Sequence, residues 1–170
     1  MSRKPISSRR GYLLPLLMQS MNKVPSKYII QNKKALFDYE IVEEFTAGII
    51  LSGSEVKSIR LGQANLKGSY ITLHSGKPIL VGMHISPYKY NTAKILSPKR
   101  ERELLMKQKE ILYYSQRIKE MGSTLIPVGV FFKGNMIKIR VALARGRKNW
   151  KKKQLLKERD LSREVRKFNY

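Results

Sequence analysis

The sequence predicts a mainly β chain with helices, in which short strands close into a small barrel. Three observations support this fold class. Polar and apolar side chains alternate through DYEIVEEF at residues 38–45, a period typical of a half-buried strand. Residues 69–85 and 126–144 each contain two apolar runs separated by a glycine turn signal. A long stretch with helical spacing precedes the second of these pairs, and several short strands with turn signals are typical of a barrel.

Turn residues define the expected strand ends. Gly48 separates the first strand from the apolar run IIL at 49–51. The pair within 69–85 turns around Ser75-Gly76, and the pair within 126–144 turns at Gly134-Asn135. Each pair is therefore expected to form a hairpin.

Two helices are expected between the strands. The first is brief, SEVKSIR at 54–60, with Ser54 as its N-cap and Gly62 as its stop. The second begins at Ser97-Pro98 and ends at Gly122. Its apolar face, with Leu105 at the edge, is expected to close one end of the barrel; its members are Leu104, Leu105, Ile111, Leu112 and Ile118. Strands, a helix and more strands over 31–144 suit an oligonucleotide/oligosaccharide-binding (OB) type barrel, whose ligands include RNA.

Charge indicates the class of partner. The 170 residues have a formal net charge of +23, and so large a charge opposes compaction unless a polyanion such as nucleic acid neutralises it. Residues 1–37 contribute +8, residues 145–170 contribute +8, and the longer middle contributes +7. Residues 1–30 and 145–170 are therefore expected to be basic arms on a milder body. The first is expected to be disordered, with an organellar transit peptide or an early start site as alternatives.

Catalytic and metal-binding patterns are missing from the sequence. It contains no Cys, and its two histidines, His74 and His84, lack the spacing of metal ligands. Glu43 and Glu44 are neighbours in a strand, so they point to opposite faces and cannot act as a pair. The apolar run YLLPLLM at 12–18 is too short to cross a membrane. We therefore expect a binding protein with no enzyme activity, metal or cofactor.

Basic side chains also mark the predicted body. Lys57 and Arg60 lie on the short helix, and Lys133 lies near the last turn. In the final strand Lys138 and Arg140 alternate with apolar residues, which predicts one apolar and one cationic face. A solvated outer face is the alternative, but the overall charge favours contact with RNA.

The C-terminal arm combines cations with the one tryptophan of the chain, Trp150, in RGRKNWKKKQ at 145–154. As a helix over 150–168 it would repel itself through like charges four residues apart, so we expect disorder alone and a helix on binding RNA. An aromatic ring among cations can stack on an exposed base. Packing of Trp150 against the barrel is the alternative.

Six blocks along the chain match one family in order. They are NKKALFDYEI (32–41), AGIILSGSEVKSIRLGQANLKGSYI (47–71), HISPY (84–88), GSTLIPV (122–128), KIRVALARGRK (138–148) and KERDLSRE (157–164). Together they resemble the SsrA-binding proteins, also called small protein B. The resemblance implies a bacterial cytoplasmic OB-type barrel, expected to be a monomer without membrane contact. It implies binding to the tRNA-like part of transfer-messenger RNA, which is delivered to stalled ribosomes for trans-translation.

The resemblance also implies functional residues. The expected RNA-binding residues are Asn32, Lys33, Lys34, Lys57, Arg60, Asn65, His84, Tyr88, Leu105 and Lys138. The tail is expected to enter the decoding centre and message channel of the small subunit, with Trp150 stacking there. The expected tail residues are Gly146, Arg147, Lys148, Trp150, Lys152, Lys157, Arg159, Arg163 and Arg166.

Three positions depart from the family pattern, and two other functions remain open. Thr46 replaces a commonly acidic residue, Glu103 replaces a Lys, and Lys151 replaces an Asp. We expect these departures to leave the fold unchanged. They argue against the acidic RNA contact at position 46 and against a tail register identical to that of the family. A ribosomal or tRNA-binding protein without a rescue role shares the composition and the barrel. Binding of acidic membranes through an amphipathic tail is disfavoured by the sparse apolar face.

Overall fold

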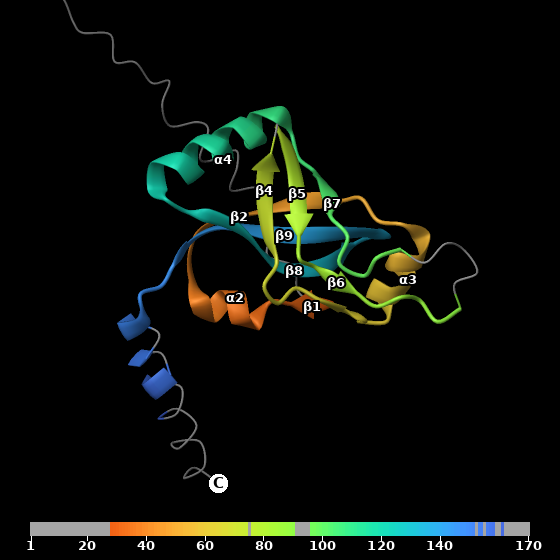
Figure 1. Ribbon diagram of the computed structural model, residues 1–170, viewed down its shortest axis with the longest axis horizontal. Coiled ribbons are helices and arrows are strands. Elements are labelled where there is room, and N and C mark those ends of the chain that lie inside the picture. The colour runs from red at the N-terminus through yellow and green to blue at the C-terminus, as the bar shows by residue number, and fades with distance from the viewer. Residues whose placement is uncertain are drawn as a thin grey trace, which may run out of the picture.

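The computed structural model describes residues 28–74, 76–90, 96–151, 153–154, 156–158 and 161 (Figure 1). Most of the arm predicted over 1–30 lies outside these residues. Its last part does not, because Ile30 pairs with Val130 and the Ile29 amide donates to the Val130 carbonyl at 2.8 Å. The ordered body therefore begins before residue 31.

The strands form a closed antiparallel ring, which confirms the mainly β prediction and the small barrel. Around the ring the order is β8-β4-β5-β7-β2-β9, and pairing of β8 with β9 closes it. The ring strands are β2 (Tyr39–Ile49), β4 (Tyr70–His74), β5 (Lys77–Val81), β7 (Arg102–Leu105), β8 (Thr124–Lys133) and β9 (Met136–Gly146). A short β1 (Ile30–Gln31) also pairs with β8, while β3 (Ala64–Asn65) and β6 (His84–Ile85) form a separate pair.

The two predicted hairpins are present. Strands β4 and β5 turn at Gly76, whose φ is +74°, and β8 and β9 turn at Gly134, whose φ is +59°. Both φ values lie in the left-handed region that glycine adopts without a steric cost. The last strand extends to Gly146, so the barrel runs two residues past the expected boundary at 144.

Apolar side chains fill the ring and cover part of its outside. The interior core includes Phe45, Leu80, Leu104 and Val141. A second cluster lies outside β8 and β9, where Ala35 of helix α2 (Lys33–Asp38) packs on the sheet. Figure 1 shows α2 on one side of the ring and α4 on the other, with α3 near β6.

The strand prediction was wrong at Gly48. The strand β2 runs through it without a break, and Gly48 lies directly opposite Leu105 of β7. A Cβ at Gly48 would lie 3.0 Å from the Leu105 Cβ. Gly48 therefore permits close packing of a side chain over the strand and does not end it.

The start of the short helix also differs from its prediction. Helix α3 (Gly53–Arg60) is capped by Ser52 rather than Ser54. The Glu55 amide donates to Ser52 Oγ at 3.4 Å, and the Ser52 amide donates to Glu55 Oε2 at 2.9 Å. This is a capping box, in which two orphan amides at the helix start are satisfied reciprocally.

The predicted long helix is a strand followed by a shorter helix. Residues Arg102–Leu105 form β7, with Arg102 and Leu104 buried and Leu105 58% exposed. Helix α4 (Gln108–Met121) starts ten residues after Pro98 and ends at Gly122, as expected. The error arose because two adjacent leucines, Leu104 and Leu105, fit the spacing of a helix as well as that of a strand. Leu112, which was assigned to the buried face, is 63% exposed.

Candidate RNA interface

Four of the expected RNA-binding residues meet at one end of the barrel. Asn65 of β3 lies opposite His84 of β6 in the strand register. Lys57 of α3 places its Nζ 5.2 Å from the centroid of the Tyr88 ring. Asn65 and Lys57 are exposed and the other two side chains are half-buried. A cation, an aromatic ring, an imidazole and an amide on one surface are the groups that contact phosphates and unpaired bases.

A buried ion cluster fixes this end of the barrel. Glu55 of α3 accepts hydrogen bonds from Arg100 Nε at 2.9 Å and Arg102 Nε at 3.0 Å. Arg102, only 1% exposed, also donates to the carbonyl of Met83 at 2.7 Å and to that of Pro98 at 3.0 Å. The cluster therefore fixes α3, with Lys57, relative to the segment that contains His84 and Tyr88.

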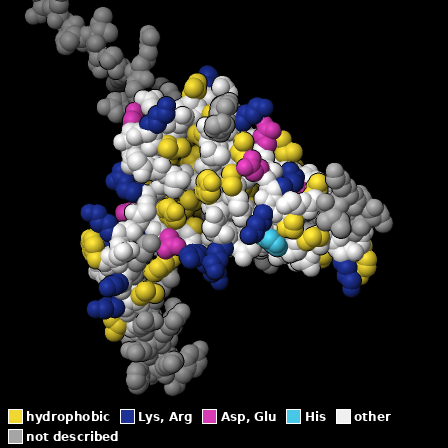
Figure 2. All heavy atoms as spheres, viewed as in Figure 1, with side chains coloured by type: hydrophobic (Ala, Val, Ile, Leu, Met, Phe, Trp, Pro, Cys, Tyr) yellow, Lys and Arg dark blue, Asp and Glu magenta, His cyan; other side chains and the backbone are white. Residues whose placement is uncertain are grey.

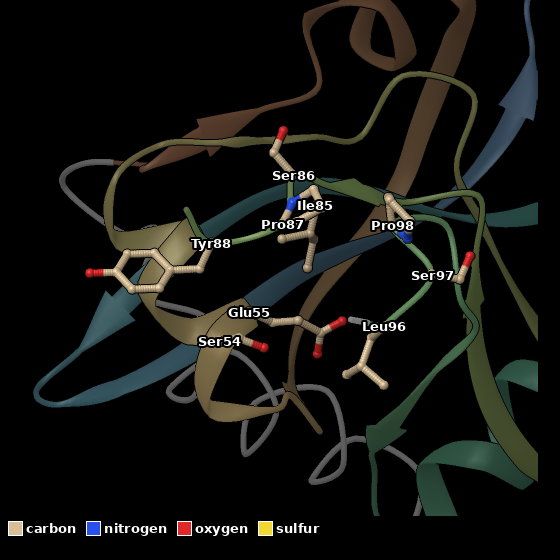
Figure 3. A pocket seen from close by; sticks show the side chains of 9 residues that line it. All are labelled: Ser54, Glu55, Ile85, Ser86, Pro87, Tyr88, Leu96, Ser97 and Pro98. Carbon is tan, nitrogen blue, oxygen red and sulfur yellow. The ribbon is translucent and has the colours of Figure 1, made fainter. Parts of the chain in front are cut away.

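Figure 3 shows this junction from close by. Ser54 and Glu55 of α3 face Ile85 and Pro87 across a cavity of about 20 Å³. Such a volume holds about one water molecule. Tyr88 extends from the rim of the cavity, so the backbone that carries its ring belongs to this packed junction.

The buried pair shifts two pKa values. Burial acts to raise the pKa of Glu55, but hydrogen bonds from Arg100 and the Ser52 amide and the charge of Arg102 outweigh it, so the pKa lies below its usual value. Burial lowers the pKa of Arg102, and Glu55 opposes that shift. Both side chains are therefore charged at neutral pH, and each compensates the other in the interior.

Asn32 supports the surface from within. Its side chain is buried, with 4% exposed. Its Oδ1 accepts from the Ala35 amide at 3.1 Å as the N-cap of α2, and its Nδ2 donates to the carbonyls of Leu66 at 2.9 Å and Pro127 at 3.0 Å. Direct RNA contact by Asn32 is therefore not supported. Its bonds orient the exposed Lys33 and Lys34.

Leu105 and Lys138 flank Gly48 on adjacent strands. Gly48 pairs with Leu105 on one side and with Lys138 on the other. Directly opposite residues of antiparallel strands share a face, so the three form one row. Leu105 is mostly exposed and Lys138 half-buried. An apolar side chain beside a cation on an open face can pack on a ribose or base while the cation meets a phosphate.

Arg140, two residues beyond Lys138, does not belong to a cationic face as predicted. It is 1% exposed, and its Nε donates to Glu44 Oε2 at 3.0 Å. Its Nη1 donates to Thr46 Oγ1 at 3.1 Å. Tyr28 lies beside it over Gly129, where a Cβ would be 2.5 Å from the Tyr28 Cδ1. Thr46, which departs from the family pattern, therefore contacts the buried Arg140.

The root of the tail is attached to the body by backbone contacts. The Arg147 amide donates to the Asp38 carbonyl at 2.9 Å, and Arg147 Nη1 donates to the Phe37 carbonyl at 3.3 Å. Beyond it, the described positions 149–151, 153–154, 156–158 and 161 are helical. Gly146, Lys148 and Lys157 are exposed. Four expected tail residues lie outside the described residues: Lys152, Arg159, Arg163 and Arg166.

Trp150 remains accessible. It is 59% exposed, so the barrel does not enclose it. It lines an open hollow of about 260 Å³ with Glu40 and Lys151. Lys151 Nζ lies 3.7 Å from Glu40 Oε2 and 5.7 Å from the Trp150 ring. The departure at Lys151 thus makes an exposed ion pair with β2.

The surface has no features of a metal site or membrane span within the described part of the chain. No group of three His, Cys, Asp or Glu side chains lies within reach of one ion there. Nor is any helix in that part long and apolar enough to cross a membrane. Figure 2 shows lysine and arginine side chains gathered over α2 and beside β6.

Comparison with known proteins assigns the chain to a family. A family model described as SmpB protein matches residues 29–169. The chain belongs to the SmpB family. The SsrA-binding protein of Carboxydothermus hydrogenoformans is 45% identical over 141 residues, which cover 83% of this chain and 95% of that SmpB relative. The SsrA-binding protein of Chlorobaculum tepidum is 47% identical over 137 residues, covering 80% and 87%.

A solved structure supports the same assignment. It is described as "tmRNA-SmpB: a journey to the center of the bacterial ribosome". One of its chains aligns with a TM-score of 0.60 and 35% identity, covering 71% of this chain and 85% of its own. The SmpB-like fold and the family resemblance predicted from the sequence motifs are confirmed.

Proposed function

We propose that this protein binds transfer-messenger RNA with its barrel and delivers it to stalled ribosomes through its tail. The convergence of Lys57, His84 and Tyr88 on one surface carries the proposal. This surface belongs to a chain whose relatives are SsrA-binding proteins. Access to ribosomes requires the bacterial cytoplasm, and we expect a monomer without enzyme activity.

The barrel has the chemistry of a structured RNA partner. Lys33, Lys34, Lys57 and Arg60 are exposed cations that neutralise phosphates. Tyr88 and Leu105 offer apolar faces to bases and riboses. Because the buried Arg102 cluster fixes α3 against β6, these groups are in place before RNA arrives. Such preorganisation lowers the entropic cost of binding.

The tail is suited to a different target. Trp150 is exposed at the start of the helical positions, with basic residues on both sides. We propose that it stacks in the decoding centre while the tail cations contact ribosomal RNA along the message channel. Disorder of the free tail and helix formation on binding stay predictions.

Truncation after Lys148 tests this division. Arg147 is bonded to the backbone of Phe37 and Asp38, so the cut leaves β9 and its attachment intact. We expect affinity for transfer-messenger RNA to remain within about threefold at fixed salt, while peptide tagging on stalled ribosomes is lost. Equal loss of both activities would contradict the proposal. Stoichiometric ribosome binding without transfer-messenger RNA would instead support the ribosomal-protein alternative.

A further inference from the structure

Tyr90 is an exposed aromatic residue at the edge of the RNA surface. Among the described residues, no large apolar side chain is more exposed, at 74% of its surface. A ring left in water contributes little to folding, because its apolar area is not removed from solvent. Neither the barrel core nor the outer cluster under α2 includes Tyr90.

The neighbours of Tyr90 are an aromatic ring and a cation. Its ring centroid lies 5.8 Å from that of Tyr88, with an interplanar angle of 66°. Lys89 Nζ lies 5.9 Å from the Tyr90 centroid, within the range of cation–π attraction. Lys57 Nζ lies 5.2 Å from the Tyr88 ring. Each of the two rings therefore has a lysine close to it.

The ring of Tyr88 is held more firmly than that of Tyr90. Tyr88 is half-buried and lines the small cavity with Ser54 and Pro87 (Figure 3). It packs edge-on against Tyr90, an arrangement that aromatic quadrupoles favour. Tyr90 therefore contacts one ring while 74% of its surface stays exposed.

Single-stranded regions of RNA are bound by this combination. Unstacked bases pack on aromatic side chains, and nearby Lys or Arg side chains meet the phosphates on either side. A paired duplex offers no free base face to such a ring. An exposed aromatic ring beside a second ring and two cations therefore fits a loop or bulge better than a helix.

We propose that Tyr90 is a stacking platform for one unpaired base of the bound RNA, with Lys57 and Lys89 meeting the flanking phosphates. This inference rests on the proposed function and adds a contact to it. The site is built by α3 and the segment that follows β6. Its ligand is a base in a loop or bulge of the tRNA-like domain of transfer-messenger RNA.

The test measures affinity of the full chain for the tRNA-like domain across a series of salt concentrations. Tyr90→Ala removes the ring, and we expect affinity to fall about 5- to 50-fold with the salt dependence unchanged. Tyr90→Phe keeps the ring and is expected to stay within about twofold of the original protein. Lys89→Gln is expected to reduce the slope of log affinity against log salt by about 1.

Two controls isolate stacking from folding and from general charge. Leu112→Ala shortens another exposed apolar side chain, on α4, and should leave RNA affinity unchanged. A fully paired RNA duplex of similar length, without a loop or bulge, should bind the original protein and Tyr90→Ala equally. Thermal unfolding midpoints of all variants are expected to agree, since Tyr90 is mostly exposed.

Several results would overturn the inference. Unchanged affinity of Tyr90→Ala would show that no base stacks there. A loss for Tyr90→Phe as large as for Tyr90→Ala would assign the contact to the hydroxyl group. Unchanged RNA affinity with impaired tagging would indicate a protein partner on the ribosome. If the original protein itself fails to bind the tRNA-like domain, the proposed function falls, and the inference with it.

Discussion

The barrel surface and the tail expose similar groups but hold them by different means. On the barrel, Lys57 and Tyr88 are positioned by Arg102, a fully buried cation bonded to Glu55 and to three backbone carbonyls. On the tail, Lys151 forms an exposed ion pair with Glu40 at 3.7 Å and lies 5.7 Å from the Trp150 ring. Buried ionic networks are costly to break and exposed pairs contribute little. The barrel groups are therefore held in place by the body, whereas folding of the tail on its partner stays a prediction.

The largest expected effect comes from removing the buried cation. Arg102→Ala leaves Glu55 in the interior with one of its two arginines gone and removes the donors to Met83 and Pro98. We expect the free energy of unfolding to fall by about 3–5 kcal/mol, with a parallel loss of RNA affinity. Denaturant unfolding monitored by circular dichroism measures the first quantity.

Arg100→Ala is the matched control, because Arg100 is 30% exposed and binds the same carboxylate. Its expected cost is about 1 kcal/mol. Equal losses of stability for Arg100→Ala and Arg102→Ala would show that burial of the cation does not matter. That result would contradict the claim that the buried Arg102 holds the RNA surface in place.

A smaller effect is expected at Gly48. Gly48→Ala places a Cβ about 3.0 Å from the Leu105 Cβ, which forces that side chain to move. Because the Leu105 Cβ is fixed to the backbone of β7, the two strands must separate slightly, and stability should fall by about 1–3 kcal/mol. RNA affinity should fall about tenfold if Leu105 is a central contact.

Combining Gly48→Ala with Leu105→Ala sharpens this test. If both act through the same side chain, their effects on RNA affinity are not additive. Additive losses would show that Gly48 affects binding by another route, and unchanged affinity in Gly48→Ala would remove Leu105 from the interface.

Acid should weaken the barrel through Glu55. Its pKa is lower in the folded protein than in the unfolded chain, despite burial, because of bonds from Arg100 and the Ser52 amide and the charge of Arg102. The stabilisation is therefore complete above the unfolded pKa of about 4.3 and is lost as pH falls through the folded value. The difference in unfolding free energy between the original protein and Glu55→Gln should be constant from neutral pH down to about 5 and shrink below that. A difference independent of pH would contradict this account of Glu55.

The smallest effect is expected at the tail root. Lys151→Ala removes an ion pair whose side chains are 46% and 57% exposed. The free energy of unfolding should change by less than about 0.5 kcal/mol, as judged by the same denaturant titration. Glu40→Gln removes the charge of the same ion pair and should change the free energy of unfolding by as little. A loss above about 1 kcal/mol in either variant would mean that the body holds the tail firmly.

Local signals predicted much of the fold. Period-two alternation and the left-handed glycines Gly76 and Gly134 were sufficient for the two hairpins. Gly122 correctly ended the long helix. These features depend on residues close together in the sequence, where propensity and turn chemistry decide the structure.

Features that depend on distant partners could not be predicted. Arg102 has a long, charged side chain, which sequence patterns place on the surface. It is nevertheless buried because Glu55, 47 residues earlier, neutralises its charge. Gly48 was interpreted as a break because glycine is a local turn signal, whereas its partner Leu105 is distant in the sequence. Arg140 was assigned to a cationic face from local alternation, whereas Glu44 and Thr46, which bind it, lie on another strand.

The candidate site shows the same division. Motif resemblance identified Lys57, His84 and Tyr88, and the structure brings them to one end of the barrel. The buried side chains that hold that end, Glu55 and Arg102, carry no surface signal. Tyr90 was missed because an exposed aromatic in a loop has no periodic pattern.

The most direct test of the division between body and tail is Trp150→Ala, with Trp150→Phe as the matched variant that keeps an aromatic ring. Trp150 is 59% exposed, so neither change should affect folding. Affinity for transfer-messenger RNA and tagging on ribosomes stalled at a message end are measured at one salt concentration. We predict that Trp150→Ala keeps RNA affinity within about twofold and loses tagging, while Trp150→Phe retains most of both. Loss of RNA affinity in proportion to tagging, or full tagging by Trp150→Ala, would contradict the account.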